Sequence, residues 1–152
     1  MIQRIQTVFL FLVFLVALLL MFFPLASFHI NESVFQMSIF SFDGVENLDI
    51  EVPNIMAIGI LDALLGIMAL FAIFQFKNRK FQMKMVMINM LINFGLLAAI
   101  FYYADQVGTS LDIKANYDIA AYFPIVSVLF LILANRNIRA DEKLVRQSER
   151  LR

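Results

Sequence analysis

The chain has 152 residues, of which 62% are hydrophobic and 17 are phenylalanine, and its formal net charge is zero. A soluble domain of this length cannot bury so much apolar surface, so the composition favours a membrane protein. The absence of cysteine excludes disulfides and thiolate metal sites, and the single histidine, His29, makes no metal site alone. We expect no cofactor and no nucleic-acid partner.

Four stretches are apolar over about the 20 residues that a helix needs to cross a bilayer. The predicted spans are 7–28, 55–76, 85–103 and 117–134. The sequence therefore predicts an all-α membrane protein, with residues 1–152 forming a single integral membrane domain built on a four-helix bundle. The remaining segments are external loops 29–54 and 104–116, a cytoplasmic loop 77–84 and a cytoplasmic tail 135–152.

The first span has a second interpretation, as a cleaved secretory signal. Its apolar run of about sixteen residues exceeds the usual signal core of about 7–15, and Pro24 stands where a small residue should precede a cut after Ala26. We therefore expect an uncleaved span.

Positive charge is segregated along the chain. Of the twelve basic residues, only Lys114 lies in a predicted external loop, whereas acidic residues gather there. Short cytoplasmic segments retain Lys and Arg, so both termini are expected in the cytoplasm. The resulting cytoplasmic basic face comprises Arg4, Lys77, Arg79, Lys80, Lys84, Arg136, Arg139, Lys143, Arg146, Arg150 and Arg152.

The first external loop shows the period of β-strands. "NLDIEV", residues 47–52, alternates apolar and polar positions, as do residues 35–39, and Asp43–Gly44 supplies a turn between the two runs. We expect a small extracytoplasmic β-hairpin between the first two helices. The alternative is an irregular loop whose aromatic side chains dip into the membrane interface.

The fourth span is expected to continue into the cytoplasm as one helix. Residues 125–152 contain neither Gly nor Pro, and they are rich in good helix formers. The extension is interpreted either as a solvated helix that fixes topology or as a helix that binds a partner or lipid.

The two ends of the chain carry specific sequences. "MIQRIQT" at residues 1–7 and "LANRNIRADEKLVRQSERLR" at residues 133–152 resemble the terminal signatures of domain-of-unknown-function family 4293, four-span membrane proteins of Bacteroidetes. The resemblance implies four helices in the inner membrane of a Gram-negative cell, and it brings no activity and no catalytic residue. The matching residues lie on the cytoplasmic side, where they form a functional surface or simply fix orientation and touch anionic lipid.

Apart from Asp118 at the outer edge of the fourth span, Asp62 is the one acidic or basic side chain inside the predicted spans, where a charge is costly and faces other helices. At about 1.5 Å per residue, Asn93 and Ser127 lie at a similar depth. Asn89 shares a helix face with Asn93. The predicted intramembrane polar cluster is therefore Asp62, Asn89, Asn93 and Ser127, and a small-residue helix-packing face lies beside it: Gly59, Ala63, Gly66 and Ala69.

Two functions follow from this cluster. In the favoured one, Asp62 hydrogen-bonds Asn93 and Ser127 and holds helices together in a non-enzymatic accessory or assembly subunit of a larger membrane complex. In the alternative, Asp62 binds a proton or cation in a small ion- or metabolite-coupled carrier. No nucleophile–base pair, phosphate loop or metal spacing predicts an enzyme. The expected partners are the lipid bilayer and either another membrane protein or further copies of the chain.

Overall fold

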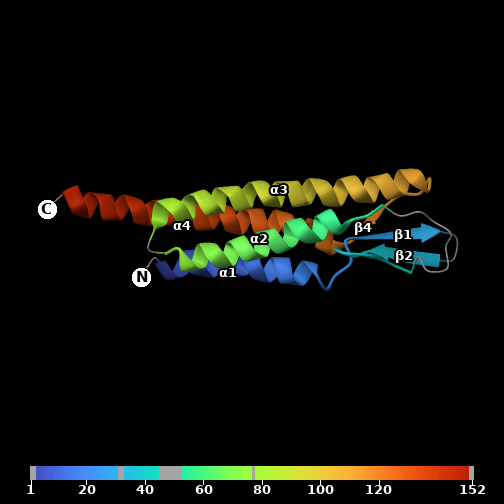
Figure 1. The fold of residues 1–152 in the computed structure, drawn as a ribbon, viewed down its shortest axis with the longest axis horizontal. Coiled ribbons are helices and arrows are strands. Elements are labelled where there is room, and N and C mark those ends of the chain that lie inside the picture. Colours follow the sequence, from blue (N-terminus) through green and yellow to red (C-terminus); the bar gives the residue numbers. More distant parts are fainter. Residues whose placement is uncertain (1–2, 31–32, 45–52, 77, 151–152) are drawn as a thin grey trace.

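The computed structural model describes residues 3–30, 33–44, 53–76 and 78–150. These residues form four long α-helices that lie side by side, with a small β-sheet at one end (Figure 1). The helices are α1 Gln3–Leu20, α2 Met56–Phe74, α3 Arg79–Ser110 and α4 Phe123–Arg150. We call the end of the bundle where α1 begins and α4 finishes the terminal end, and the opposite end the sheet end.

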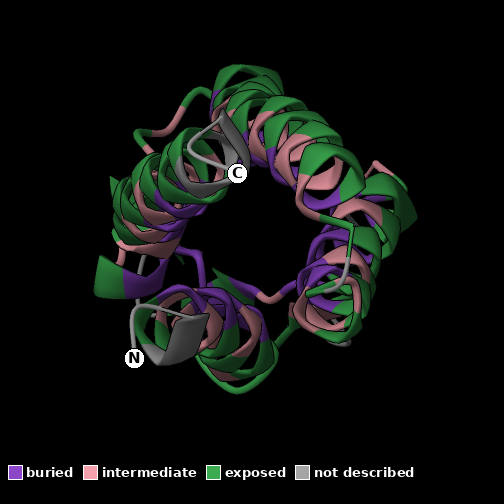
Figure 2. Cartoon of the chain, turned by 90° about the vertical axis from the view of Figure 1, so that its left-hand side faces the viewer, coloured by how far each residue is buried: buried purple, intermediate pink, exposed green. Residues whose placement is uncertain are grey.

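The helices form a ring in which neighbours run in opposite directions. α1 packs against α2, α2 against α3, α3 against α4, and α4 against α1. Viewed along the bundle, buried residues face inward and exposed residues face outward (Figure 2). The outer surface carries large apolar side chains such as Ile67, Phe94 and Leu91, the last 71% exposed. A surface of this kind suits lipid better than water.

Length and composition agree with a membrane environment. Among the described helices, three are long and apolar enough to cross a membrane: α2, α3 and the stretch Ile119–Val145, which contains most of α4. The apolar part of α1, Ile5–Leu20, is shorter. The fold is therefore a mostly helical bundle of membrane-protein character with a small antiparallel sheet, as the sequence predicted in outline.

The predicted first span, 7–28, is too long. α1 ends at Leu20, and Ala26–Ile30 form strand β1. Pro24 disfavours helical geometry at the residue before it, so the helix cannot run through this point. The N–H of Leu25 instead donates to the carbonyl of Met37 (2.7 Å), which draws the chain into the sheet.

The described strands form an antiparallel sheet in the order β3-β2-β1-β4. Their bounds are β1 Ala26–Ile30, β2 Ser33–Met37, β3 Phe42–Asp43 and β4 Asn116–Tyr117. Register pairs Phe28 with Phe35, and their rings stack with centroids 4.9 Å apart and planes 9° apart. Both side chains are fully buried, so the sheet carries its own apolar layer over the end of the bundle.

The predicted β-structure between the first two helices is present as part of a small antiparallel sheet. Phe35 and Met37 are buried in β2, as the alternation indicated. β2 pairs on one side with β1, most of which was predicted as helix, and on the other side with β3. The predicted strand at residues 47–52 lies outside the described residues. The chain reverses between β2 and β3 at residues 38–41, so Asp43–Gly44 is not the turn that joins the paired strands.

The sheet joins two connections that are distant in sequence. β4, from the α3–α4 connection, pairs with β1, from the α1–α2 connection. The hydroxyl of Ser27 donates to Oδ2 of Asp118 (2.7 Å), and the N–H of Asp118 donates to the carbonyl of Leu25 (3.0 Å). The two helical hairpins are thereby fastened together at the sheet end.

α3 extends beyond the predicted third span, 85–103, in both directions. Asn78 caps its start, because its side-chain oxygen accepts a hydrogen bond from the N–H of Phe81 (3.2 Å). Residues 79–84 and 104–110, predicted as loops, are helical. Hydropathy marks the apolar part of a helix and misses its polar ends.

α4 confirms the prediction of one helix that continues past the apolar stretch, since it runs unbroken to Arg150. The predicted fourth span, 117–134, begins too early, because Tyr117 belongs to β4 and Ile119–Tyr122 form a 3₁₀ helix before α4 starts at Phe123. Pro124 lies in its first turn, where a missing N–H leaves no hydrogen bond unmade. Figure 1 shows that α4 extends beyond the other helices at the terminal end.

Candidate functional site

Buried polar side chains lie on the inward faces of the bundle helices. Each is at most 5% exposed, although the outer surface beside them is apolar. We call this set the polar core: Gln6 on α1, Asp62 on α2, Gln82, Asn89 and Asn93 on α3, and Ser127 and Asp141 on α4. The predicted cluster is fully contained in it, so every member of that cluster is buried as expected.

Side-chain amides of α3 bind the backbone of α2. Nδ2 of Asn89 donates to the carbonyl of Leu65 (3.2 Å), and Nε2 of Gln82 donates to the carbonyl of Ala72 (2.9 Å). The donors are seven residues apart and so are the acceptors, which fixes a regular antiparallel register. In an apolar medium, each such bond between helices stabilises the pair by about 0.6–2 kcal/mol.

The same register places Asp62 level with Asn93. Asp62 precedes Leu65 by three residues, and Asn93 follows Asn89 by four, so both lie about one helical turn further toward the sheet end. This agrees with the similar depths estimated from the sequence. The polar core therefore runs from the terminal end into the bundle as far as this level.

The predicted hydrogen bonds from Asp62 to Asn93 and Ser127 are absent from the described residues. Oδ1 of Asp62, both side-chain polar atoms of Asn93 and Oγ of Ser127 are buried with no hydrogen-bond partner in the protein. Each unpartnered buried atom costs about 1–3 kcal/mol. Of the predicted cluster, Asn89 does make a hydrogen bond between helices, and its partner is the backbone carbonyl of Leu65. Side-chain types alone do not reveal a partner of this kind.

The inward face of α3 changes character along its length. Toward the terminal end it carries Gln82, Asn89 and Asn93. Toward the sheet end the buried positions become Leu96 and Ile100, then Ala104 and Val107. Asp62 therefore lies at the boundary between the polar part of the interior and the apolar part, and the sheet covers the apolar end.

Sequence reasoning missed Gln82, Gln6 and Asp141. Gln82 was assigned to a loop because the third span was placed by hydropathy alone. Its signal was present, because Gln82 precedes Asn89 by seven residues and therefore shares its helix face. Continuing the helical period upstream of the apolar run would have found it.

The predicted small-residue face of α2 is correct in three of its four positions. Gly59, Gly66 and Ala69 are buried, whereas Ala63 is exposed. Ala63 follows Asp62 by one residue, so it is rotated about 100° away from the inward face. A Cβ at Gly66 would lie 3.5 Å from Cβ of Ala17 on α1, which identifies α1 as the helix that approaches this face.

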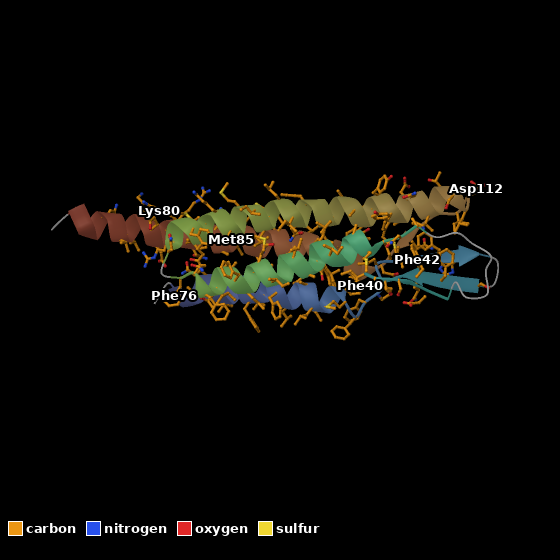
Figure 3. The ribbon with its side chains drawn as sticks, viewed as in Figure 1. Phe40, Phe42, Phe76, Lys80, Met85 and Asp112 are labelled. Atoms are coloured by element: carbon orange, nitrogen blue, oxygen red, sulfur yellow. The ribbon has the colours of Figure 1, made fainter. Side chains whose placement is uncertain are left out.

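Basic side chains lie toward the terminal end, and the sheet end carries Lys114. Lys80 and Asp112 mark opposite ends of α3 (Figure 3). Of the predicted basic face, five side chains are described as exposed and Arg79 as partly buried: Lys80, Lys84, Arg136, Arg139 and Lys143. Lys77 and Arg152 lie outside the described residues, and the remaining three, Arg4, Arg146 and Arg150, lie in α1 and α4.

A hydrogen bond links the basic start of α3 to α4. Nη1 of Arg79 donates to the backbone carbonyl of Asp141 (3.0 Å). Asn78, Arg79 and Lys80 line a hollow of about 420 Å³ together with Glu142 and Val145 of α4. This contact sets Asp141 level with the first residue of α3.

A further hollow lies at the sheet end, where the sequence predicted no site. It has about 510 Å³ and is lined by Asp105, Gly108, Thr109, Asp112, Ile113, Lys114, Ala115 and Tyr117. Burial raises the pKa of Tyr117 above its ordinary value of 10.0, and the negative charge of Asp105 raises it further. Within the described residues, no group of three or more His, Cys, Asp or Glu side chains is placed to hold a metal ion.

Comparison with known proteins gives one family. A family model described as domain of unknown function (DUF4293) matches residues 2–151. No curated protein matches the chain.

Proposed function

Because the chain belongs to the DUF4293 family and has the apolar outer surface described above, we propose that it is a non-enzymatic integral protein of a bacterial inner membrane. It crosses the bilayer four times, with the terminal end in the cytoplasm, and acts as an accessory or assembly subunit of a larger membrane complex. The separation of charge supports this orientation, because Lys and Arg are retained on the cytoplasmic side.

The observation that carries the proposal is the projection of α4. Arg79 at the start of α3 binds the carbonyl of Asp141, and α4 continues from there to Arg150, so that its end extends beyond the other helices (Figure 1). Leu144 is 52% exposed on this projection and lies next to the basic Lys143. An apolar side chain among basic ones, held on a rigid helix in the cytoplasm, is suited to an acidic protein surface with an apolar pocket.

The test is copurification of the tagged full-length protein from native membranes in mild detergent. We expect a stoichiometric protein partner with the unmodified chain and its loss with Leu144→Glu. Gln147→Glu is the matched control, because it adds the same charge at an exposed position of the same projection. Recovery of the chain without a stoichiometric partner would contradict the proposal.

A second function, an ion-coupled carrier, is favoured by the polar core. Asp62 and Asn93 are buried at one level with unpartnered polar atoms, which suits binding of a proton or small cation. Proton flux through the Asp62→Asn variant, measured in proteoliposomes that contain a pH-sensitive dye, distinguishes the two functions. Flux lost with assembly intact supports the carrier, whereas lost assembly supports a packing role. Asp105→Asn, at an exposed carboxylate outside the core, is the control.

A further inference from the structure

A groove between α3 and α4 combines apolar and basic side chains. It has a volume of about 240 Å³ and is lined by Met90, Ile132, Asn135, Arg136 and Arg139. Ile132 is 46% exposed, so the groove opens on the outer, lipid-facing surface of the bundle. It is distinct from the polar core, which faces inward.

The lining of the groove is ordered along α4. Ile132 belongs to the apolar run that ends at Ala134, and Asn135, Arg136 and Arg139 follow it toward the terminal end. Arg139 lies two residues before Asp141, which is level with the start of α3. The groove therefore crosses the level where the hydrocarbon of the bilayer gives way to its headgroups.

We propose that this groove binds one anionic phospholipid, an inference that rests on the membrane insertion proposed above. Arg136 and Arg139 are three residues apart and lie on one side of α4, so both guanidinium groups reach a single phosphate. Long Arg side chains bury their stems in apolar surface and carry their charge toward the interface. One acyl chain lies along Met90 and Ile132.

Asn135 adds selectivity for the headgroup. Its Oδ1 is buried at the groove and has no hydrogen-bond partner in the protein. Placed beside the phosphate, this oxygen accepts a hydrogen bond from a headgroup hydroxyl. A phosphoglycerol headgroup supplies both the negative charge and the hydroxyl, whereas phosphocholine supplies neither net charge nor a donor.

The expected strength follows from the two charges. A basic residue near an anionic lipid surface contributes an affinity factor of about five. Removal of both guanidinium groups therefore lowers the affinity for an anionic lipid about 25-fold. Basic pockets between transmembrane helices on the cytoplasmic side recognise anionic headgroups by this electrostatic term.

The test is native mass spectrometry of the full-length protein in detergent, titrated with dioleoyl phosphatidylglycerol or dioleoyl phosphatidylcholine. We expect one phosphatidylglycerol per chain, bound at least about fivefold more tightly than phosphatidylcholine. Arg136→Gln/Arg139→Gln should weaken phosphatidylglycerol binding about 25-fold, and Asn135→Ala should narrow the preference over phosphatidylcholine. Lys80→Gln/Lys84→Gln is the matched control, because it removes the same charge from exposed positions outside this groove.

Three results would overturn the proposal. Equal losses in the two double variants would show general charge attraction rather than a site. Displacement of phosphatidylglycerol by inorganic phosphate alone, with the same Arg dependence, would show a site for free anions. Unchanged lipid binding in Met90→Ala/Ile132→Ala would exclude the acyl-chain contact. If the Arg double variant fails to insert, Arg139→Gln alone carries the test with an expected fivefold loss.

Failure of this inference is separable from failure of the proposed function. Extraction of the chain from membranes by alkaline carbonate would refute membrane insertion itself. Carbonate-resistant protein that shows no preference for the anionic lipid would refute the groove alone. The partner on the α4 projection is measured independently by copurification.

Discussion

Asn89 of α3 donates its side-chain amide to the backbone carbonyl of Leu65 on α2, across 3.2 Å in the buried interior of the bundle. A carbonyl inside a helix already accepts an intrahelical bond, so this contact uses its second lone pair. The bond ties two helices inside the polar core of the bundle. Asn89 is therefore a buried polar residue whose hydrogen bond stabilises the contact between α2 and α3.

Replacing this donor should weaken the bundle. We expect Asn89→Ala to lower the free energy of unfolding by about 1–2 kcal/mol, measured by reversible SDS titration in mixed micelles. Asn137→Ala is the control, because Nδ2 of Asn137 binds the carbonyl of Leu133 on its own helix at an exposed site. A loss of equal size in both variants would contradict a stabilising contact between helices.

Ser127→Ala should have the opposite sign. Oγ of Ser127 is buried without a hydrogen-bond partner, so its removal relieves a desolvation penalty. We expect the free energy of unfolding to stay equal or rise by up to about 1 kcal/mol in the same titration. A clear loss of stability would show that Ser127 does bond across helices, as the sequence first indicated.

Replacing Gly66 or Gly95 with a larger residue should affect the stability of the protein differently. Gly66→Leu forces a side chain against Ala17 and Phe14 of α1 and should cost about 1–3 kcal/mol of stability. Gly95→Leu is the matched control, since a Cβ there meets nothing within 4 Å. Ala63→Leu should also be tolerated, because Ala63 is exposed. Equal thermal stability of all three variants in detergent would refute the assigned packing face.

Tyr117 should be a late-titrating tyrosine at the sheet end. Its raised pKa means that the folded state holds the phenolic proton more tightly than the unfolded state. Its contribution to stability is therefore full below pH 10 and declines as the pH rises through the folded-state pKa. Asp105→Asn should lower the Tyr117 pKa, followed by the phenol carbon in ¹³C-tyrosine NMR.

Asp112→Asn is the control for that titration, because Asp112 lines the same hollow but is not among the causes of the shift. If both substitutions move the Tyr117 pKa equally, the effect comes from the net charge of the hollow and not from Asp105.

Sequence reasoning found the helices where apolar composition and helix-forming residues coincide, as in α2 and α4. It misplaced the end of α1, because Leu25, Ala26 and Phe28 suit a buried strand as well as a membrane helix, and hydropathy does not separate the two. Pro24 was the signal that should have ended the helix.

The sequence predicted four of the seven polar-core residues, and it did not predict the hydrogen bonds that they make. Burial of Asp62 and Asn93 follows from the cost of polar groups in lipid, whatever the helix geometry. The partner of Asn89 is a main-chain carbonyl, and every residue of α2 has one, so side-chain identity carries no information about it. Choosing Leu65 requires the antiparallel register, which the structure supplies.

The strand pairing between β1 and β4, with the bond from Ser27 to Asp118, has a mechanical consequence. It locks the two connections at the sheet end to each other, so relative motion of the α1–α2 and α3–α4 pairs is smallest there. Rocking of one pair against the other must pivot about the sheet and widen the bundle toward the opposite end. Water admitted by such a movement would pass Asp141, Gln6 and Gln82 before it reached the level of Asp62 and Asn93.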